Sequence, residues 1–308
     1  MPDNNRTVSA VYKDFVYAPD NENNGMRILK YIGSADKVKI PDEINGEKVV
    51  SLGAYVFVDT DDAGEGKFKA DIAKNGKMTP QEIMLPAELK YISYCALYGC
   101  ENIKSIIIPE SVAEIGSSAF AFCRKLEIIR LPSGISILNR SMFRNCDSLK
   151  EAIITGNVET IGFIAFENCK ALENVVLPDS VSSIEMRAFC GCSSLKRIKL
   201  PDNDIVFGNG AFAESGLIDV TIPSTSFISE AMFHNCRELE SLRVSHGLKE
   251  IRADAFNGCH SLESVHFPEG VRMIGNRAFC GCEVLESLSP VETDAVYGDD
   301  VWKDTNFC

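Results

Sequence analysis

The sequence predicts a solenoid, either mainly β or α/β, in which about ten units of 23 residues coil into one elongated body. Three observations predict it. An aromatic residue returns every 23 residues, a proline closes a short alternating segment in most units, and columns of glycine or asparagine mark turns. A unit of this size cannot bury its apolar edge alone, so its stability must come from stacking on its neighbours.

The repeat is clearest in the motif Ala-Phe-x-x-Cys, whose aromatic residue we use as a marker. After Phe120 the marker returns at intervals of 23 residues, except for one interval of 21, at Phe143, Phe166, Phe189, Phe212, Phe233, Phe256 and Phe279. Leu97 lies 23 residues before Phe120, and Phe57 lies 40 residues before Leu97. The longer gap is one period plus an insertion. Chance does not keep such a phase, so ten stacked units are predicted.

One short strand is predicted in each unit, directly before a proline. In one unit Val175 and Leu177 stand two residues apart, with Val176 between them. This is the spacing of buried residues in a strand that has one buried face. Eight units place a proline at the same point, namely Pro41, Pro86, Pro109, Pro132, Pro178, Pro201, Pro223 and Pro268. Proline cannot donate to a strand ladder, so it ends each strand at a fixed position.

Two columns of small residues predict the corners of the coil. Two places after the marker stand Gly99, Asn145, Asn168, Gly191, Asn235, Gly258 and Gly281. This composition indicates a backbone site with positive φ. A second corner is marked by Gly53, Gly116, Gly162, Gly208 and Gly275. One strand and two corners in every unit describe a coil.

Eight of the twelve cysteines share the place three residues after the marker, at Cys100, Cys123, Cys146, Cys169, Cys192, Cys236, Cys259 and Cys282. Free cysteine packs as a compact hydrophobic residue, so a column of buried thiols is predicted at one corner. Cys190 and Cys280 complete two Cys-Gly-Cys pairs, which suggest halves of a zinc site. The pairs lie four turns apart, roughly 19 Å, whereas zinc–sulfur bonds measure about 2.3 Å. We expect neither a metal nor a cofactor.

Charge and motifs exclude several functional classes. The net charge of −13 argues against nucleic-acid binding, which needs a basic footprint. No apolar run approaches the roughly 18–20 residues of a transmembrane helix, and the first residues lack the apolar core of a signal peptide. No catalytic motif occurs, and the four histidines, His234, His246, His260 and His266, occupy separate columns, with only His246 and His266 able to approach each other on adjacent turns. No enzymatic activity is expected.

The insertion at about residues 60–79 is polar and rich in glycine, aspartate and lysine. The segment from Asp59 to Gly64 faintly resembles a calcium-binding loop. However, Ala63 and Ala70 stand where such a loop needs oxygen ligands. We therefore expect a surface loop without a bound ion.

The combination Leu-x-x-Ile-x-Leu-Pro, then Ile-Gly, then Ala-Phe-x-x-Cys resembles the leucine-rich repeat of the BspA type over roughly residues 28–290. The resemblance implies a right-handed leucine-rich-repeat coil with a concave parallel β-sheet and few helical residues. It also implies a place on a bacterial cell surface or in secretion, with roles in adhesion and protein binding, and it supplies no catalytic residues. The sequence departs from the family in two respects. The family's usual leader is missing, so the chain is expected to be either trimmed or cytoplasmic. In one unit Ser215 replaces the cysteine.

We expect a single domain over residues 1–308, with an N-terminal cap at 1–37, repeats at 38–290 and a C-terminal cap at 291–308. The favoured function is a monomeric module that binds a protein or a glycan through the concave sheet. The alternative is a passive structural spacer in a surface assembly. A binding face should be patterned, whereas the face of a spacer should be uniform.

The candidate binding residues flank the central residue of each strand, namely Ile107, Ile128, Arg130, Ile153, Val176, Arg197, Lys199, Arg243 and His266. The four aliphatic members are predicted to form a strip on four successive turns, with the basic members in a second strip beside it. Only Glu151 and Asp219 add acidic groups to this face. Contiguous apolar surface often marks a partner site, and neighbouring charge would orient the partner.

Overall fold

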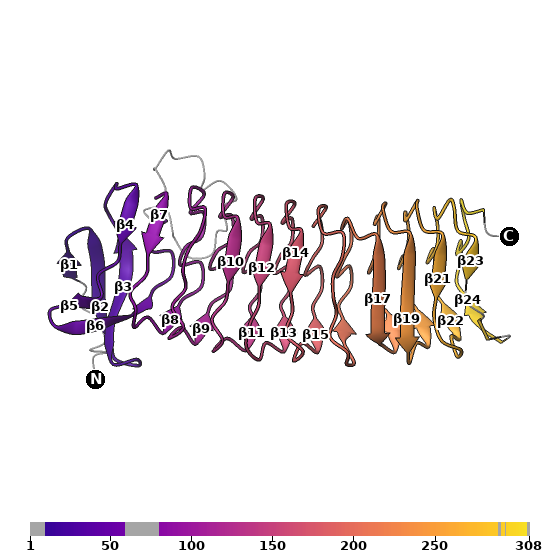
Figure 1. The fold of residues 1–308 in the computed structure, drawn as a ribbon, viewed down its shortest axis with the longest axis horizontal. Coiled ribbons are helices and arrows are strands. Elements are labelled where there is room, and N and C mark those ends of the chain that lie inside the picture. Colours follow the sequence, from indigo (N-terminus) through magenta and orange to yellow (C-terminus); the bar gives the residue numbers. More distant parts are fainter. Residues whose placement is uncertain (1–9, 59–79, 289–290, 293, 307–308) are drawn as a thin grey trace, which may run out of the picture.

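The computed structural model describes residues 10–58, 80–288, 291–292 and 294–306. Within these ranges the chain is a β-solenoid of about eleven turns and contains no helix. Figure 1 shows the turns stacked along the long axis, with the two termini at opposite ends. None of the described residues belongs to a helix that could cross a membrane. The inserted segment predicted at residues 60–79 lies outside the described residues.

The strands predicted before the prolines form a first parallel ladder, which occurs in three stretches. They are β4 (Lys37–Lys39) with β7 (Glu82–Met84); β10 (Ile128–Arg130), β12 (Glu151–Ile153) and β14 (Asn174–Val176); and β17 (Asp219–Ser224), β19 (Ser241–His246), β21 (Ser264–His266) and β23 (Ser287–Leu288). The expected continuous sheet is therefore interrupted twice, since residues 103–108 form only an isolated bridge at Ser105 and residues 195–200 form no strand. The second gap precedes the one unit that is shortened to 21 residues.

A second parallel ladder, which was not predicted, is built from two-residue strands at the glycine corner. Its strands are β8 (Tyr91–Ile92) and β9 (Glu114–Ile115); β11 (Ile137–Leu138), β13 (Thr160–Ile161), β15 (Ser183–Ile184) and β16 (Val206–Phe207); and β18 (Phe227–Ile228), β20 (Glu250–Ile251), β22 (Met273–Ile274) and β24 (Val296–Tyr297). In most of these strands the second residue is buried and the first faces outward. Most turns thus contribute a strand to each of two ladders, rather than one strand and two corners.

The N-terminal strands extend the second ladder. β1 (Ala10–Tyr12), β2 (Phe15–Asp20) and β3 (Gly25–Tyr31) form an antiparallel meander, and β3 then pairs in parallel with β6 (Glu47–Leu52). β5 (Glu43–Ile44) pairs antiparallel with β6 across the turn that joins them. The last residue of β3, Tyr31, donates its backbone N–H to Val56 O at 2.7 Å, as marker residues do in later turns.

The core is a ladder of stacked rings formed by the marker residues. From Phe120 to Phe279 every marker ring is fully buried. Adjacent rings lie 5.1–5.7 Å apart, centroid to centroid, with interplanar angles of 6–18°. Trp302 stands 23 residues after Phe279 and stacks on it at 5.1 Å and 11°. The solenoid therefore has one turn more than the ten repeats predicted, with a tryptophan in the marker place.

The predicted positive-φ column is confirmed. From Gly99 to Gly281 every residue two places after the marker has positive φ, for example 60° at Asn168 and 77° at Gly258. The second glycine column has a different cause, because those glycines lie where adjacent turns approach closely. A Cβ at Gly162 would lie 2.4 Å from Leu138 O, which leaves no room for a side chain.

Candidate binding face

The outer face of the first ladder carries all nine residues predicted to bind a partner. In each strand the central residue, such as Ile129 or Ala152, is buried, so the residues on either side of it point outward. The exposed fraction is 87% at Ile107, 48% at Ile128 and 46% at Val176. Ile153 is half-buried, and the four basic residues and His266 are exposed.

Strand register sorts these residues into two rows. The first, which we call the acid-free row, contains Ile107, Arg130, Ile153, Val176, Lys199, Thr221, Arg243 and His266. Ile107 and Lys199 take their places in it by the spacing of 23 residues. The second, the mixed row, contains Ser105, Ile128, Glu151, Asn174, Arg197, Asp219, Ser241, Ser264 and Ser287. No carboxylate occurs in the acid-free row.

This register corrects the predicted aliphatic strip. Ile128 pairs with Glu151 in the mixed row, whereas Ile107 and Ile153 belong to the acid-free row and are separated there by Arg130. Of the four aliphatic residues in the predicted strip, only Ile153 and Val176 are direct neighbours in one row. Residue chemistry alone does not separate the two rows, because they differ only in their distance from the marker.

Pairing within the face also differs between the rows. In the mixed row Arg197 Nε lies 3.2 Å from Asp219 Oδ2, and Asn174 Nδ2 donates to Glu151 Oε1 at 2.9 Å. In the described part of the chain, Arg130, Lys199 and Arg243 of the acid-free row form no ion pair. The mixed row is thus largely self-compensated, and the acid-free row presents uncompensated positive charge.

Six copies of the BspA type leucine rich repeat region match residues 75–178 and 159–286. The chain belongs to this family. BspA-type repeats are typical of surface proteins and of protein-interaction modules, and leucine-rich-repeat solenoids as a family are non-enzymatic scaffolds.

Two solved structures resemble the BspA-type chain in fold. A leucine-rich repeat protein from Bacteroides ovatus has 22% sequence identity and a TM-score of 0.67, over 96% of this chain and 92% of that one. The pneumococcal vaccine antigen PcpA has 18% identity and a TM-score of 0.55, over 94% of this chain and 71% of that one. At these identities the likeness concerns the fold alone. No functionally curated protein matches the chain.

The cysteine column of the BspA-type repeat is buried, as predicted, and has a further role in hydrogen bonding. Each of seven thiols donates to the backbone carbonyl of the marker residue one turn earlier, as Cys146 does to Phe120 O at 3.2 Å and Cys169 to Phe143 O at 3.1 Å. Each of these carbonyls also accepts from the backbone N–H three residues further on, as Phe120 O does from Cys123 N at 3.2 Å, so the thiol occupies the second acceptor position of the carbonyl. The thiol fits this place because it is small and can still donate.

We expect the thiols of Cys123, Cys146 and Cys169 to react slowly with an alkylating reagent in the folded protein. Burial raises the pKa of each thiol well above its usual value, so at any given pH less of the reactive thiolate is present. The half-buried Cys280 should react faster. Mass spectrometry of timed labelling at pH 8 measures this order. Rapid native labelling of most of the column would contradict it.

Cys308, which the sequence predicts to be the most reactive thiol, lies outside the described residues.

The histidines are dispersed over the fold. His246 pairs with Ser224 and His266 pairs with Arg243, so the two rings are not neighbours in one row. Among the described residues, no group of three or more His, Cys, Asp or Glu side chains could hold a metal ion.

Proposed function

We propose that this BspA-type chain is a non-enzymatic binding module that holds a protein partner on the outer face of its first ladder, in adhesion or surface recognition. One observation carries the proposal. The acid-free row contains no carboxylate from Ile107 to His266, although the chain has 44 acidic residues against 31 basic ones. Such a row is patterned in the way that a binding face should be.

The chemistry of the row favours a partner surface with an apolar centre and acidic flanks. Ile153 and Val176 lie side by side, and Arg130 and Lys199 lie one turn beyond them on either side. With turns about 4.8 Å apart, the two cations are roughly 14 Å from each other. Apolar contacts at the centre of an interface supply affinity, and complementary charges around them orient the partner and speed association.

The chain is proposed to bind its partner outside the cell, because repeats of this family are typical of surface proteins.

Only one part of the face favours the alternative function, that of a passive spacer. The mixed row ends in three serines, Ser241, Ser264 and Ser287, which is the uniform surface that a spacer would carry.

An affinity capture against surface proteins of host cells and of the producing cells tests the proposal. We expect the double variant Ile153→Asp, Lys199→Glu to recover at least about tenfold less of a partner that the native chain retains, which is a loss of about 1.4 kcal/mol. Capture by the native chain should also weaken as salt is added, because exposed charges are screened.

The matched control is Ile137→Asp, Lys249→Glu, which makes the same changes at exposed positions of the second ladder, in β11 and beside β20. This variant should recover the partner as the native chain does. Equal recovery by both double variants would contradict a site on the acid-free row. The spacer alternative predicts no partner whose capture depends on either pair.

A further inference from the structure

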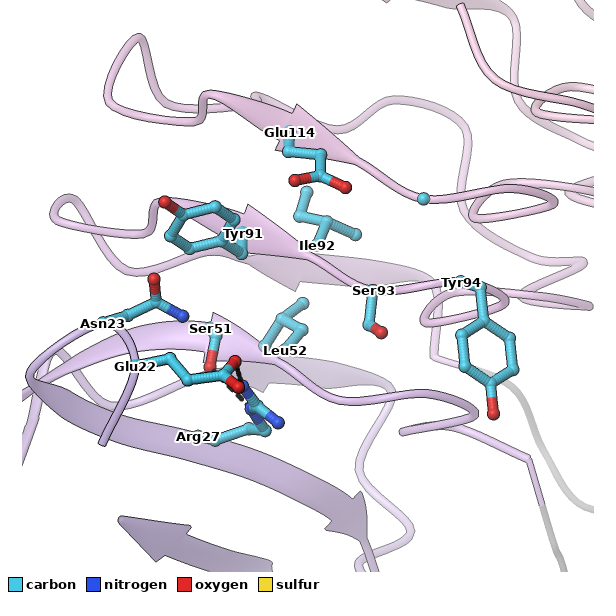
Figure 2. Close-up of a pocket in the computed structure, with 11 residues that line it drawn as sticks. Glu22, Asn23, Arg27, Ser51, Leu52, Tyr91, Ile92, Ser93, Tyr94 and Glu114 are labelled. Carbon is cyan, nitrogen blue, oxygen red and sulfur yellow. Dashed lines mark hydrogen bonds and ion pairs between the residues drawn. The ribbon is translucent and has the colours of Figure 1, made fainter. Parts of the chain in front are cut away.

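A hollow of about 570 Å³ lies on the second ladder near its N-terminal end. Arg27 of β3, Ser51 of β6, Tyr91 of β8 and Glu114 of β9 are in register there on four neighbouring strands. Ser51 is small and only 2% exposed, whereas the side chains on both sides of it are long. One small side chain interrupts this row of long ones, and Arg27 leans over it, with Nε 3.2 Å from the Ser51 hydroxyl. The hollow therefore opens beside Tyr91, and Figure 2 shows Asn23 next to Ser51 and Tyr91 there.

The turn between β2 and β3 supplies one wall of the hollow. Glu22 and Asn23 belong to this turn, and Figure 2 shows both beside Arg27 and Ser51. The turn is fixed by Asp20, whose backbone oxygen accepts from Asn23 N at 3.2 Å and whose carboxylate accepts from Asn23 Nδ2 at 2.9 Å. The Asn23 side chain of this wall is therefore held in place before a ligand arrives.

Asp20 also fixes the floor. Its side chain is 1% exposed, lies 3.0 Å from Arg27 Nη2 and accepts a hydrogen bond from the Ser51 hydroxyl. Burial acts to raise the pKa of Asp20, but the bonds from Asn23 and Ser51 and the charge of Arg27 outweigh it and lower the pKa. The carboxylate therefore stays charged and compensates Arg27, which remains 37% exposed at the hollow.

The remaining groups combine hydrogen-bond donors, acceptors and aromatic surface. Arg27, Asn23 and Ser93 can donate, and Glu22 and Glu114 can accept. Tyr91 is half-buried, and Tyr94, which packs edge-on against Tyr55 at 5.6 Å, is 53% exposed. Alternating donors and acceptors suit vicinal hydroxyl groups, and a phenol ring suits the apolar face of a sugar ring. The two rim carboxylates disfavour an anion, because Arg27 is already paired with Asp20 at 3.0 Å and with Glu22 at 3.8 Å.

We propose that this hollow binds a neutral saccharide. One pyranose ring lies against Tyr91, and its hydroxyl groups bond to Glu22, Asn23 and Arg27. The volume lies within the range of about 300–1,000 Å³ that is usual for small-ligand sites. The site is separate from the acid-free row and does not depend on a protein partner there.

A glycan array carrying neutral, sialylated and sulfated oligosaccharides, followed by calorimetric titration of the best neutral one, tests this proposal. We expect Tyr91→Ala and Glu22→Ala each to weaken binding at least about tenfold. Glu22 has a side chain that is 87% exposed in a turn, so its removal leaves the fold intact even where Tyr91→Ala disturbs it. Tyr297→Ala, at an exposed tyrosine near the far end of the same ladder, should bind as the native chain does.

The face variant Ile153→Asp, Lys199→Glu should also keep the saccharide, which separates this site from the protein-binding face. Binding of no neutral oligosaccharide, or of sulfated or sialylated ones alone, would overturn the proposal. So would tighter binding of Nα-acetyl-lysine amide than of any sugar, since that result would mark the tyrosines and glutamates as a site for cationic side chains.

Discussion

Truncation of Phe166 to alanine is expected to lower the free energy of unfolding by about 3–5 kcal/mol, the range found for buried phenylalanines. The ring is fully buried and stacks on Phe143 at 5.3 Å and on Phe189 at 5.2 Å. Its loss leaves a cavity between two turns that cannot close without breaking the spacing of both strand ladders. Each neighbouring turn also loses one of its two stacking partners.

Phe57→Ala is the matched comparison, and its cost should be clearly smaller. Phe57 is half-buried and meets Tyr31 at 5.5 Å with a tilt of 46°, so it is not part of the parallel stack. Urea denaturation followed by circular dichroism at the β-sheet band measures both variants. A larger loss at Phe57 than at Phe166 would show that ring stacking does not hold the array together.

Substitution of Gly162 by alanine is expected to destabilise the protein by about 3 kcal/mol, at the upper end of ordinary overpacking. The added Cβ would lie 2.4 Å from Leu138 O and 3.0 Å from Arg140 N, both backbone atoms of the preceding turn. A flexible side chain could move away from such a contact, but a backbone atom cannot, and Leu138 is held in β11 of the second ladder. The two turns would therefore have to separate.

Gly134→Ala is the control, because a Cβ there meets Val112 O at an ordinary 3.4 Å and the backbone needs no positive φ. This change should be neutral or stabilise by up to about 1 kcal/mol, through the smaller entropy of the unfolded chain. The two thermal midpoints, measured side by side, should thus move in different directions or by very different amounts. Equal losses would contradict close approach as the cause of the glycine column.

The features that repeat at a fixed interval could be predicted from the sequence. The buried rings, the cysteine column and the positive φ at residues such as Asn168 all follow from one period, because stacking places equivalent residues in equivalent surroundings. Trp302 keeps the same period but was assigned to a cap, since its segment lacks the Ala-Phe-x-x-Cys motif. A count of 23 residues from Phe279 would have found it.

The second ladder could not be predicted, because strands of two residues such as Thr160–Ile161 are too short to show alternation. The binding face was predicted in its residues but not in its rows. Arg197 meets Asp219 at an interval of 22 residues, one fewer than the period, because the shortened unit follows. The hollow at Ser51 lies on the second ladder and has no sequence signal, since a small residue between two long ones is visible only once register is known.

The stack on Phe279 makes the sole tryptophan of the chain a local spectroscopic probe. Trp302 lies in the last turn, and its indole is the end member of the ring ladder. A linear array opens more readily at its ends than in its middle. Intrinsic fluorescence therefore reports on the fraying of one terminal turn, whereas far-ultraviolet dichroism averages over all of them, and the interval between the two midpoints measures how cooperatively the solenoid unfolds.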